Sequence, residues 1–132
     1  MSRERILEGR TLSYQKIVLS VSGRMMRLRL KRHLAPRTVR LILDALPIRG
    51  NAHVSGNMTY VNTDIKSGLE RGRTEFHAGD VAFLPGQRCI CFVTGPYSTK
   101  KPMALIGTTE GDASILRTVG PGDAVDIYEE TP

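Results

Sequence analysis

The sequence has 132 residues, of which 40% are hydrophobic and 24% are charged. This length suits one domain, and this composition is typical of a soluble globular protein rather than a disordered one. No apolar run approaches the roughly 20 residues that a membrane-spanning helix requires, so we expect no membrane association. The first five residues lead into no apolar stretch, which argues against a secretory signal and favours a cytoplasmic protein.

Positive charge is concentrated in the first part of the chain. Residues 1–50 carry twelve basic and three acidic residues, a net charge of +9, whereas residues 51–132 carry seven and ten, a net charge of −3. A basic half can bind nucleic acid or another polyanion. No nucleic-acid motif accompanies the charge, and aromatic residues for base stacking make up only 5%. We therefore expect a solvated basic face, and the asymmetry would also suit a homodimer that joins the basic half of one copy to the acidic half of another.

The first part of the domain is predicted to be a hairpin. Residues 1–13 are polar and irregular, and we expect them to form an N-terminal arm in front of a single domain over residues 14–132. Tyr14–Val21 is rich in β-forming residues, and Ser22-Gly23 suits a two-residue turn. Apolar and basic residues then alternate, which predicts a second strand with one buried face. Its inward residues should be Met26, Leu28 and Leu30, and its outward residues should be Arg27, Arg29 and Lys31. Together with Arg24 and Arg32 these form a candidate basic patch.

A helix is predicted directly after the hairpin, over residues 36–46. Pro36 suits the first helical turn, where its missing N–H costs nothing, and Pro47 lies beyond the end, where it stops the helix. Apolar residues within the segment recur at the spacing of one helix face, and these are Val39, Ile42, Leu43 and Leu46.

The rest of the chain consists of short apolar segments separated by glycine and proline turns, which predicts short strands. Polar segments at 64–72 and 98–102 are expected to be loops. Many short strands with such turns indicate a sandwich or a closed barrel, and the helix would plug an open end of that barrel. Strands are predicted at 58–61, 81–84, 89–94, 103–107 and 124–128, and a short helix at 112–119.

The two cysteines form a Cys-x-Cys pair, Cys89 and Cys91, within an apolar segment. On a strand their side chains share one face, but they lie too close in sequence to form a comfortable disulfide. We expect free thiols that pack in the core. The three histidines, His33, His53 and His77, have no ligand spacing to the cysteines, so we expect no metal site and no cofactor.

Several segments, taken in their order along the chain, resemble cyclophilins. Residues 35–39 (APRTV), which open the helix, are similar to the start of the first cyclophilin helix, which plugs the barrel. Residues 104–107, 110–111 and 114–119 resemble a cyclophilin strand, turn and helix. Three further segments resemble a cyclophilin-like prokaryotic family of unknown function. They are 79–86 (GDVAFLPG), 89–93 (CICFV) and Gly95-Pro96. The resemblance covers residues 14–129. It implies a mostly β fold, a cyclophilin-like closed β-barrel with one main helix and one short helical segment.

The sequence departs from cyclophilins at the isomerase motif. Prolyl isomerases of that family carry Phe-His-Arg after the first helix, and its arginine is catalytic, whereas the counterpart here is Ala52-His53-Val54. Gly56-Asn57-Met58 stands where the family has Gln-Gly-Gly-Asp, and the chain has no tryptophan. The resemblance therefore implies the fold and a groove, without the isomerase residues.

We expect a cyclophilin-like binding module for a peptide or a small molecule, without demonstrated catalysis. The groove candidates are Arg49, which lies just upstream of the motif and could replace the missing arginine, together with His53, Tyr60 and Phe83. One alternative is a divergent peptidyl-prolyl cis-trans isomerase, which is the enzyme activity to consider. The other is a polyanion-binding protein that uses the basic patch together with Arg37 and Arg40.

Overall fold

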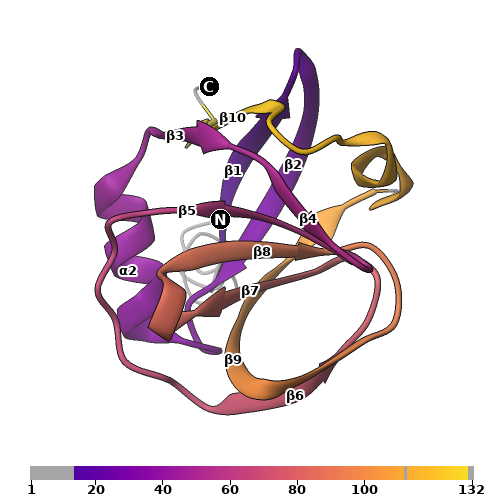
Figure 1. Ribbon diagram of the computed structural model, residues 1–132. Coiled ribbons are helices and arrows are strands. Elements are labelled where there is room, and N and C mark those ends of the chain that lie inside the picture. Colours follow the sequence, from indigo (N-terminus) through magenta and orange to yellow (C-terminus); the bar gives the residue numbers. More distant parts are fainter. Residues whose placement is uncertain (1–13, 112, 131–132) are drawn as a thin grey trace, which may run out of the picture.

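A computed structural model describes residues 14–111 and 113–130. Strands dominate this part of the chain, with one α-helix after the first hairpin and two short 3-10 helices (Figure 1). The predicted arm at residues 1–13 lies outside the described residues. The elements are β1 Tyr14–Val21, β2 Arg24–Lys31, α2 Pro36–Ala45, β3 Ile48–Asn51, β4 His53–Ser55, β5 Met58–Asn62, β6 Gly72–Phe76, β7 Asp80–Leu84, η1 Pro85–Gln87, β8 Cys89–Val93, β9 Tyr97–Glu110, η2 Ala113–Thr118 and β10 Ala124–Glu129.

The predicted hairpin is confirmed, because β1 and β2 pair antiparallel along their whole length. Ser22 and Gly23 both have positive φ, at 49° and 84°, as a tight turn matched to the strand twist requires. The alternation of β2 is also confirmed: its apolar residues Met26, Leu28 and Leu30 are buried, whereas Arg27 is exposed.

The predicted helix is confirmed, although its N-terminus is capped from an unexpected place. Ala35 stands at the N-cap position and has no side chain that could accept a hydrogen bond. The carboxylate of Glu70, from the loop after β5, takes that role: it accepts hydrogen bonds from the backbone N–H of Thr38 at 2.7 Å and of Arg37 at 3.2 Å. A helix leaves these N–H groups without partners inside the helix, so the loop supplies what the local sequence lacks.

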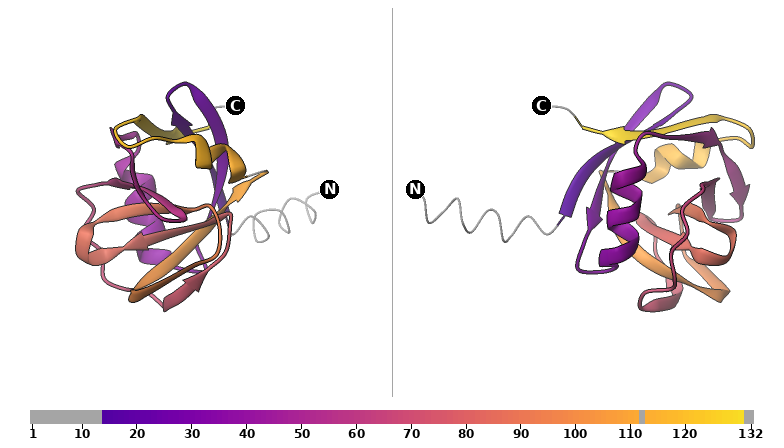
Figure 2. Two further views of the ribbon diagram at one scale, coloured as in Figure 1. Left: turned by 45° about the vertical axis from the view of Figure 1, so that its right-hand side comes forward. Right: turned by 90° about the vertical axis from the view of Figure 1, so that its left-hand side faces the viewer.

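The strands form one sheet in the order β3-β10-β1-β2-β9-β7-β8-β5-β4, with β6 paired to β9 outside this path. The sheet curls so that β3, at one end, comes near β5, the strand next to the other end, as the two views of Figure 2 show. The mostly β, cyclophilin-like fold is therefore confirmed. The expectation of a closed barrel is wrong in one respect, because no hydrogen-bonded ladder joins β3 to β5.

The barrel stays open for a local reason, at the residue between β3 and β4. The N–H and C=O groups of Ala52 are taken by Asp123 and Gly122, just before β10. β3 therefore follows β10, whereas β4 turns away and pairs with β5. We call the unjoined line between β3 and β5 the seam. It is tight at Gly50, where an added Cβ would lie 2.8 Å from Val61 Cγ2.

Two hydrophobic clusters occupy opposite faces of the curled sheet. Residues alternate between them along β8: Ile90 and Phe92 belong to the larger, interior cluster, whereas Cys89 and Cys91 belong to the smaller one. The helix packs Val39 and Ile42 into the interior cluster, and it lies beside the start of β3 and the end of β5 (Figure 1). The interior is thus closed by side chains where the ladder is missing.

Short polar strands were the elements that the sequence did not predict. β3, β4 and β6 have no apolar alternation, and β6 is exposed at four of its five residues. Residues 98–102, expected to be a loop, instead belong to the long strand β9. β6 pairs with β9 on either side of this segment, at Tyr97 and Ser98 and at Met103 and Ala104, with a register shift between them. The short helix expected at 112–119 is a 3-10 helix over Ala113–Thr118. No helix in the described part of the chain is long and apolar enough to span a bilayer.

Candidate functional site

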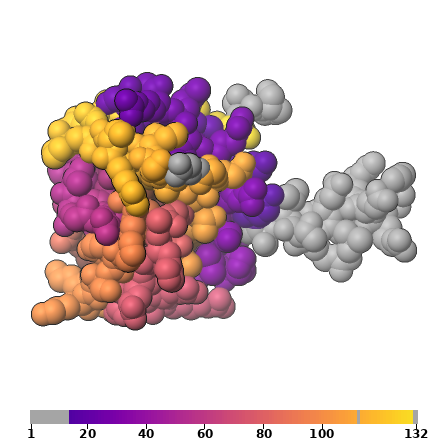
Figure 3. Space-filling view, turned by 90° about the vertical axis from the view of Figure 1, so that its right-hand side faces the viewer, coloured from indigo at the N-terminus to yellow at the C-terminus, as the bar shows by residue number. Residues whose placement is uncertain are grey.

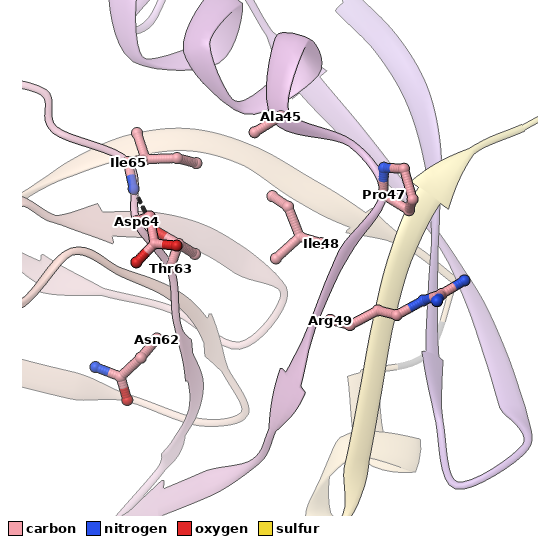
Figure 4. Close-up of a pocket in the computed structure, with 8 residues that line it drawn as sticks. All are labelled: Ala45, Pro47, Ile48, Arg49, Asn62, Thr63, Asp64 and Ile65. Atoms are coloured by element: carbon pink, nitrogen blue, oxygen red, sulfur yellow. Dashed lines mark hydrogen bonds between the residues drawn. The ribbon is translucent and has the colours of Figure 1, made fainter.

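A cavity of about 440 Å³ opens at the wide end of the seam (Figure 4). We call it the seam cavity. It lies between the last turn of α2, the start of β3 and the end of β5, because the two strands splay apart away from Gly50. Its size falls within the range of small-molecule sites in proteins. The residues that line it are Ala45, Pro47, Ile48, Arg49, Asn62, Thr63, Asp64 and Ile65.

The wall of the seam cavity is apolar on one side and polar on the other. Ile48 and Ile65 are each only 7% exposed, and their side chains converge with that of Ala45 on the space between them (Figure 4). On the polar side, Thr63 Oγ1 accepts a hydrogen bond from the N–H of Ile65 at 3.1 Å and donates to the C=O of Arg88 at 2.7 Å. These bonds fix the loop that follows β5, so the polar wall is held in place.

Strand edges face each other across the seam. In an antiparallel ladder the N–H and C=O groups of successive residues point to alternate sides. Because Ala52 points to the β10 side, Gly50 does so as well, and the main-chain groups of Arg49 and Asn51 point toward β5. Main-chain donors and acceptors are therefore available beside the apolar wall, which is the combination that an amino acid or peptide ligand requires.

Arg49 is the one predicted groove residue that lines the seam cavity. Its side chain extends away from the cavity and over β10 (Figure 4), and its Nε lies 3.6 Å from Asp126 Oδ1. That oxygen is shielded from solvent and has no hydrogen-bond partner among the described residues. Arg49 thus stands at the rim, in an ion pair without a hydrogen bond.

His53 and Tyr60 come together elsewhere, on β4 and β5. Their rings stack with centroids 5.1 Å apart and planes 19° apart, since the two residues are directly opposite in the ladder. Val54, at the position of the expected catalytic arginine, is 41% exposed. The structure therefore brings His53 and Tyr60 together and separates them from the seam cavity that Arg49 lines.

Phe83 corrects the groove prediction. It is one of the largest fully buried side chains, with 0% exposure, and belongs to the interior cluster. On β7 its side chain points inward because Ala82 and Leu84 take the other face. It therefore contributes to the core and to no groove surface.

A second cavity, of about 420 Å³, lies between the turn before β7, the end of β9 and η2. Hydroxyl groups and glycines make up much of its wall, including Thr108, Thr109 and Gly79. Arg117 also lines it, and its Nε and one terminal nitrogen both donate to the C=O of Thr94 at 3.1 and 2.9 Å. We call it the polar cavity. Residues in it serve as controls for substitutions and titrations at the seam cavity.

The basic patch is present on β2, and acidic residues from later in the chain lie against it. Arg29 Nε donates to Glu110 at 3.0 Å, and its guanidinium lies 5.2 Å from the centre of the Tyr14 ring. Arg27 pairs with Glu130. Figure 3 shows the C-terminal segment beside the N-terminal hairpin on one face. Basic residues of the N-terminal hairpin and acidic residues of the C-terminal part therefore pair within one chain. Of the remaining members, Arg24 donates to Thr118 and Arg32 to Gln15, and Lys31 is half-buried.

The two cysteines are free and buried, as the sequence predicts. Their Sγ atoms lie 3.8 Å apart on β8. The hydrogen bond between the thiols lowers the pKa of Cys89, against the effect of burial, and raises the pKa of Cys91, where burial adds to the effect.

Most residues of the seam cavity were missed by the sequence predictions. Ile48, Asn62, Thr63 and Ile65 belong to no motif. They line one cavity only because the curl of the sheet brings β3 near β5. The single local signal was Pro47, which ends the helix where the cavity begins.

Comparisons with known proteins agree on the fold. A family model described as cyclophilin-like matches residues 15–128, and no curated protein matches the chain. The solution structure of the hypothetical protein AF2241 from Archaeoglobus fulgidus is similar with a TM-score of 0.75 at 23% identity, over 89% of this chain and 96% of that one. McbB, solved in complex with tryptophan, is similar with a TM-score of 0.74 at 20% identity, over 88% of this chain and 45% of McbB.

Proposed function

Since the chain belongs to the cyclophilin-like family, whose model matches residues 15–128, we propose that it is a binding module whose seam cavity receives a small ligand or a peptide residue. The observation that carries this proposal is the open seam with a cavity of about 440 Å³ at its wide end. The free, buried cysteines suit the reducing cytoplasm, where we place this function.

The chemistry of the wall defines the ligand class. Ile48 and Ile65 would contact an apolar side chain, and the main-chain groups of Arg49 would bind amide or carboxylate groups beside it. Arg49 at the rim would meet a negative end of the ligand if it left Asp126, with which it makes no hydrogen bond. An amino acid or a short peptide with an apolar residue fits these features. McbB has been solved with tryptophan, which makes free tryptophan a useful first probe.

A pair of matched substitutions tests the location. Ala45 and Ala78 are both exposed, and each lines one of the two cavities. Ala45→Trp should fill the seam cavity and weaken binding of apolar amino acids and peptides at least tenfold, whereas Ala78→Trp should leave their affinity unchanged. Calorimetric titration of both variants measures the difference. Loss of binding in Ala78→Trp with retention in Ala45→Trp would contradict the proposal.

The isomerase alternative needs a separate readout. Exchange spectroscopy on Xaa-Pro peptides measures cis/trans interconversion directly. We expect no acceleration, because Val54 stands where the family has its catalytic arginine and Arg49 is directed toward Asp126. Accelerated exchange that disappears in Arg49→Ala would favour the isomerase instead.

A further inference from the structure

Two thiols are held side by side on a rigid strand of the sheet. Cys89 and Cys91 are 1% and 0% exposed, and their Sγ atoms are 3.8 Å apart. β8 is hydrogen-bonded along both edges, to β5 and to β7. A strand paired on both sides holds its side chains more precisely than a loop does, so the separation of the two sulfurs is a fixed feature of the fold.

The cluster around the thiols is rich in sulfur. Four of its seven buried residues carry a sulfur atom: Met58, Cys89, Cys91 and Met103. The whole sequence contains only five methionines and two cysteines, so more than half of its sulfur lies in this one cluster. Thiolates and thioethers are soft ligands, which favour soft metal ions such as Cu⁺.

We propose that Cys89 and Cys91, with the thioether of Met58 or Met103 as a third ligand, form a binding site for Cu⁺. With metal–sulfur bonds of about 2.3 Å, two sulfurs 3.8 Å apart subtend an angle of about 111° at the ion. This angle lies between those of tetrahedral and trigonal coordination, so an ion can bridge the sulfurs where they stand.

Two alternatives, a disulfide between the cysteines and a Zn²⁺ site, fit the structure less well. A disulfide needs an S–S distance of about 2.05 Å, and the sulfurs would have to close from 3.8 Å on a strand that is hydrogen-bonded along both edges. Zn²⁺ prefers four nitrogen, oxygen or thiolate ligands. Within residues 14–111 and 113–130, no three His, Cys, Asp or Glu side chains lie together in a way that could hold a metal ion, so a third ligand would have to come from the methionines of the same cluster.

Cu⁺ would reach the thiols where β6 and the first part of β9 cover them. We call these two segments the β6–β9 arm, which is distinct from the N-terminal arm. Phe76 of β6 and Met103 of β9 belong to the sulfur-rich cluster, and β6 pairs with β9 alone. The first four residues of β6 are exposed, and the arm curves away from β7 and β8 (Figure 1). An arm with few buried residues opens locally at low cost.

The binding step balances without a redox partner. Cu⁺ replaces the protons of the two thiols, which pass to the buffer, and the thioether donates a lone pair. The metal stays Cu⁺ throughout. The product carries one net negative charge, one fewer than two free thiolates would carry.

The test uses the full chain, reduced with a phosphine under anaerobic conditions, and Cu⁺ supplied as its complex with a chromogenic chelator. The wild-type protein should withdraw one Cu⁺ per chain and develop a thiolate-to-copper charge-transfer band. Cys89→Ala and Cys91→Ala should each lower the affinity at least tenfold and remove the band. Met58→Leu or Met103→Leu should weaken binding, whereas Met25→Leu, at a methionine that is 67% exposed, should not.

A measurement on the unmodified chain covers the case in which the cysteine variants fail to fold. A ligand that binds only the native state raises the unfolding temperature, so one equivalent of Cu⁺ should raise that of the wild-type protein. No withdrawal of Cu⁺ from the chelator, binding that persists in both cysteine variants, or an unchanged or lower unfolding temperature would each overturn the proposal.

Discussion

Gly107 is the residue at which two neighbouring strands approach too closely for any side chain. It lies on β9 between Leu30 of β2 and Val81 of β7. A Cβ built there would be 2.0 Å from the carbonyl oxygen of Arg29, a backbone atom that cannot move aside without breaking the ladder. The residue therefore fixes how β2 joins the part of the sheet that carries both hydrophobic clusters.

Gly107→Ala should lower the free energy of unfolding by about 3 kcal/mol, the upper range for overpacking in a well-packed interior. Gly68→Ala is the matched control, since an added Cβ there meets nothing within 4 Å. Urea unfolding of both variants measures the effect. Equal midpoints for the two variants would show that β2 and β9 separate more easily than the structure indicates.

At the scale of elements, the loop after β5 connects the helix to the seam. Its Glu70 carboxylate caps α2, and the hydroxyl of Thr38 contributes a further hydrogen bond at 2.7 Å to the same oxygen. The loop begins with Thr63 and Ile65, which line the seam cavity. The same loop thus carries the cap of α2 at one end and a wall of the seam cavity at the other.

Glu70→Gln should lower the free energy of unfolding at neutral pH by about 1 kcal/mol, as for other helix caps. Burial alone would raise the pKa of Glu70, but the hydrogen bonds from Thr38 and Arg37 lower it below its ordinary value of 4.5. A carboxyl group whose pKa is lower when folded stabilises the fold fully above 4.5, and this stabilisation is lost as the pH falls through the lower folded value.

The difference in stability between wild type and Glu70→Gln should therefore shrink as the pH falls below 4.5. Unfolding by urea at several pH values measures it. Glu75→Gln, at an exposed residue of β6, controls for the loss of one negative charge. A difference that stays constant from neutral pH to about pH 3 would show that the carboxylate of Glu70 does not act as the cap.

Elements whose residues carry a periodic signal were predictable, and those fixed by distant partners were not. β2 and α2 follow from alternation and helical spacing, and turns such as Ser22-Gly23 follow from glycine chemistry. The polar strands β3 and β6 form because β10 and β9 offer them edges. Sequence patterns describe a residue's own periodicity and do not contain the position of its partner.

At the scale of the whole molecule, the open seam is the feature on which the proposed binding site rests. A barrel closed by hydrogen bonds would have its strand edges occupied, whereas here the edge of β3 opposite β10 faces β5 without a ladder. The fold class followed from the sequence, and so did Arg49 as a candidate. The cavity itself did not, because it exists only where Ile48 of β3 and Ile65 after β5 face each other.

The central claim is that the seam cavity binds an apolar amino acid or peptide residue. The most direct measurement is an amide NMR titration of the ¹⁵N-labelled protein with tryptophan and with short peptides that contain one apolar residue. We predict saturable shift changes at Ile48, Arg49, Thr63 and Ile65, with none at Gly79 or Thr109 in the polar cavity. Shifts confined to the polar cavity or to His53 and Tyr60, or no shifts with any probe, would contradict it.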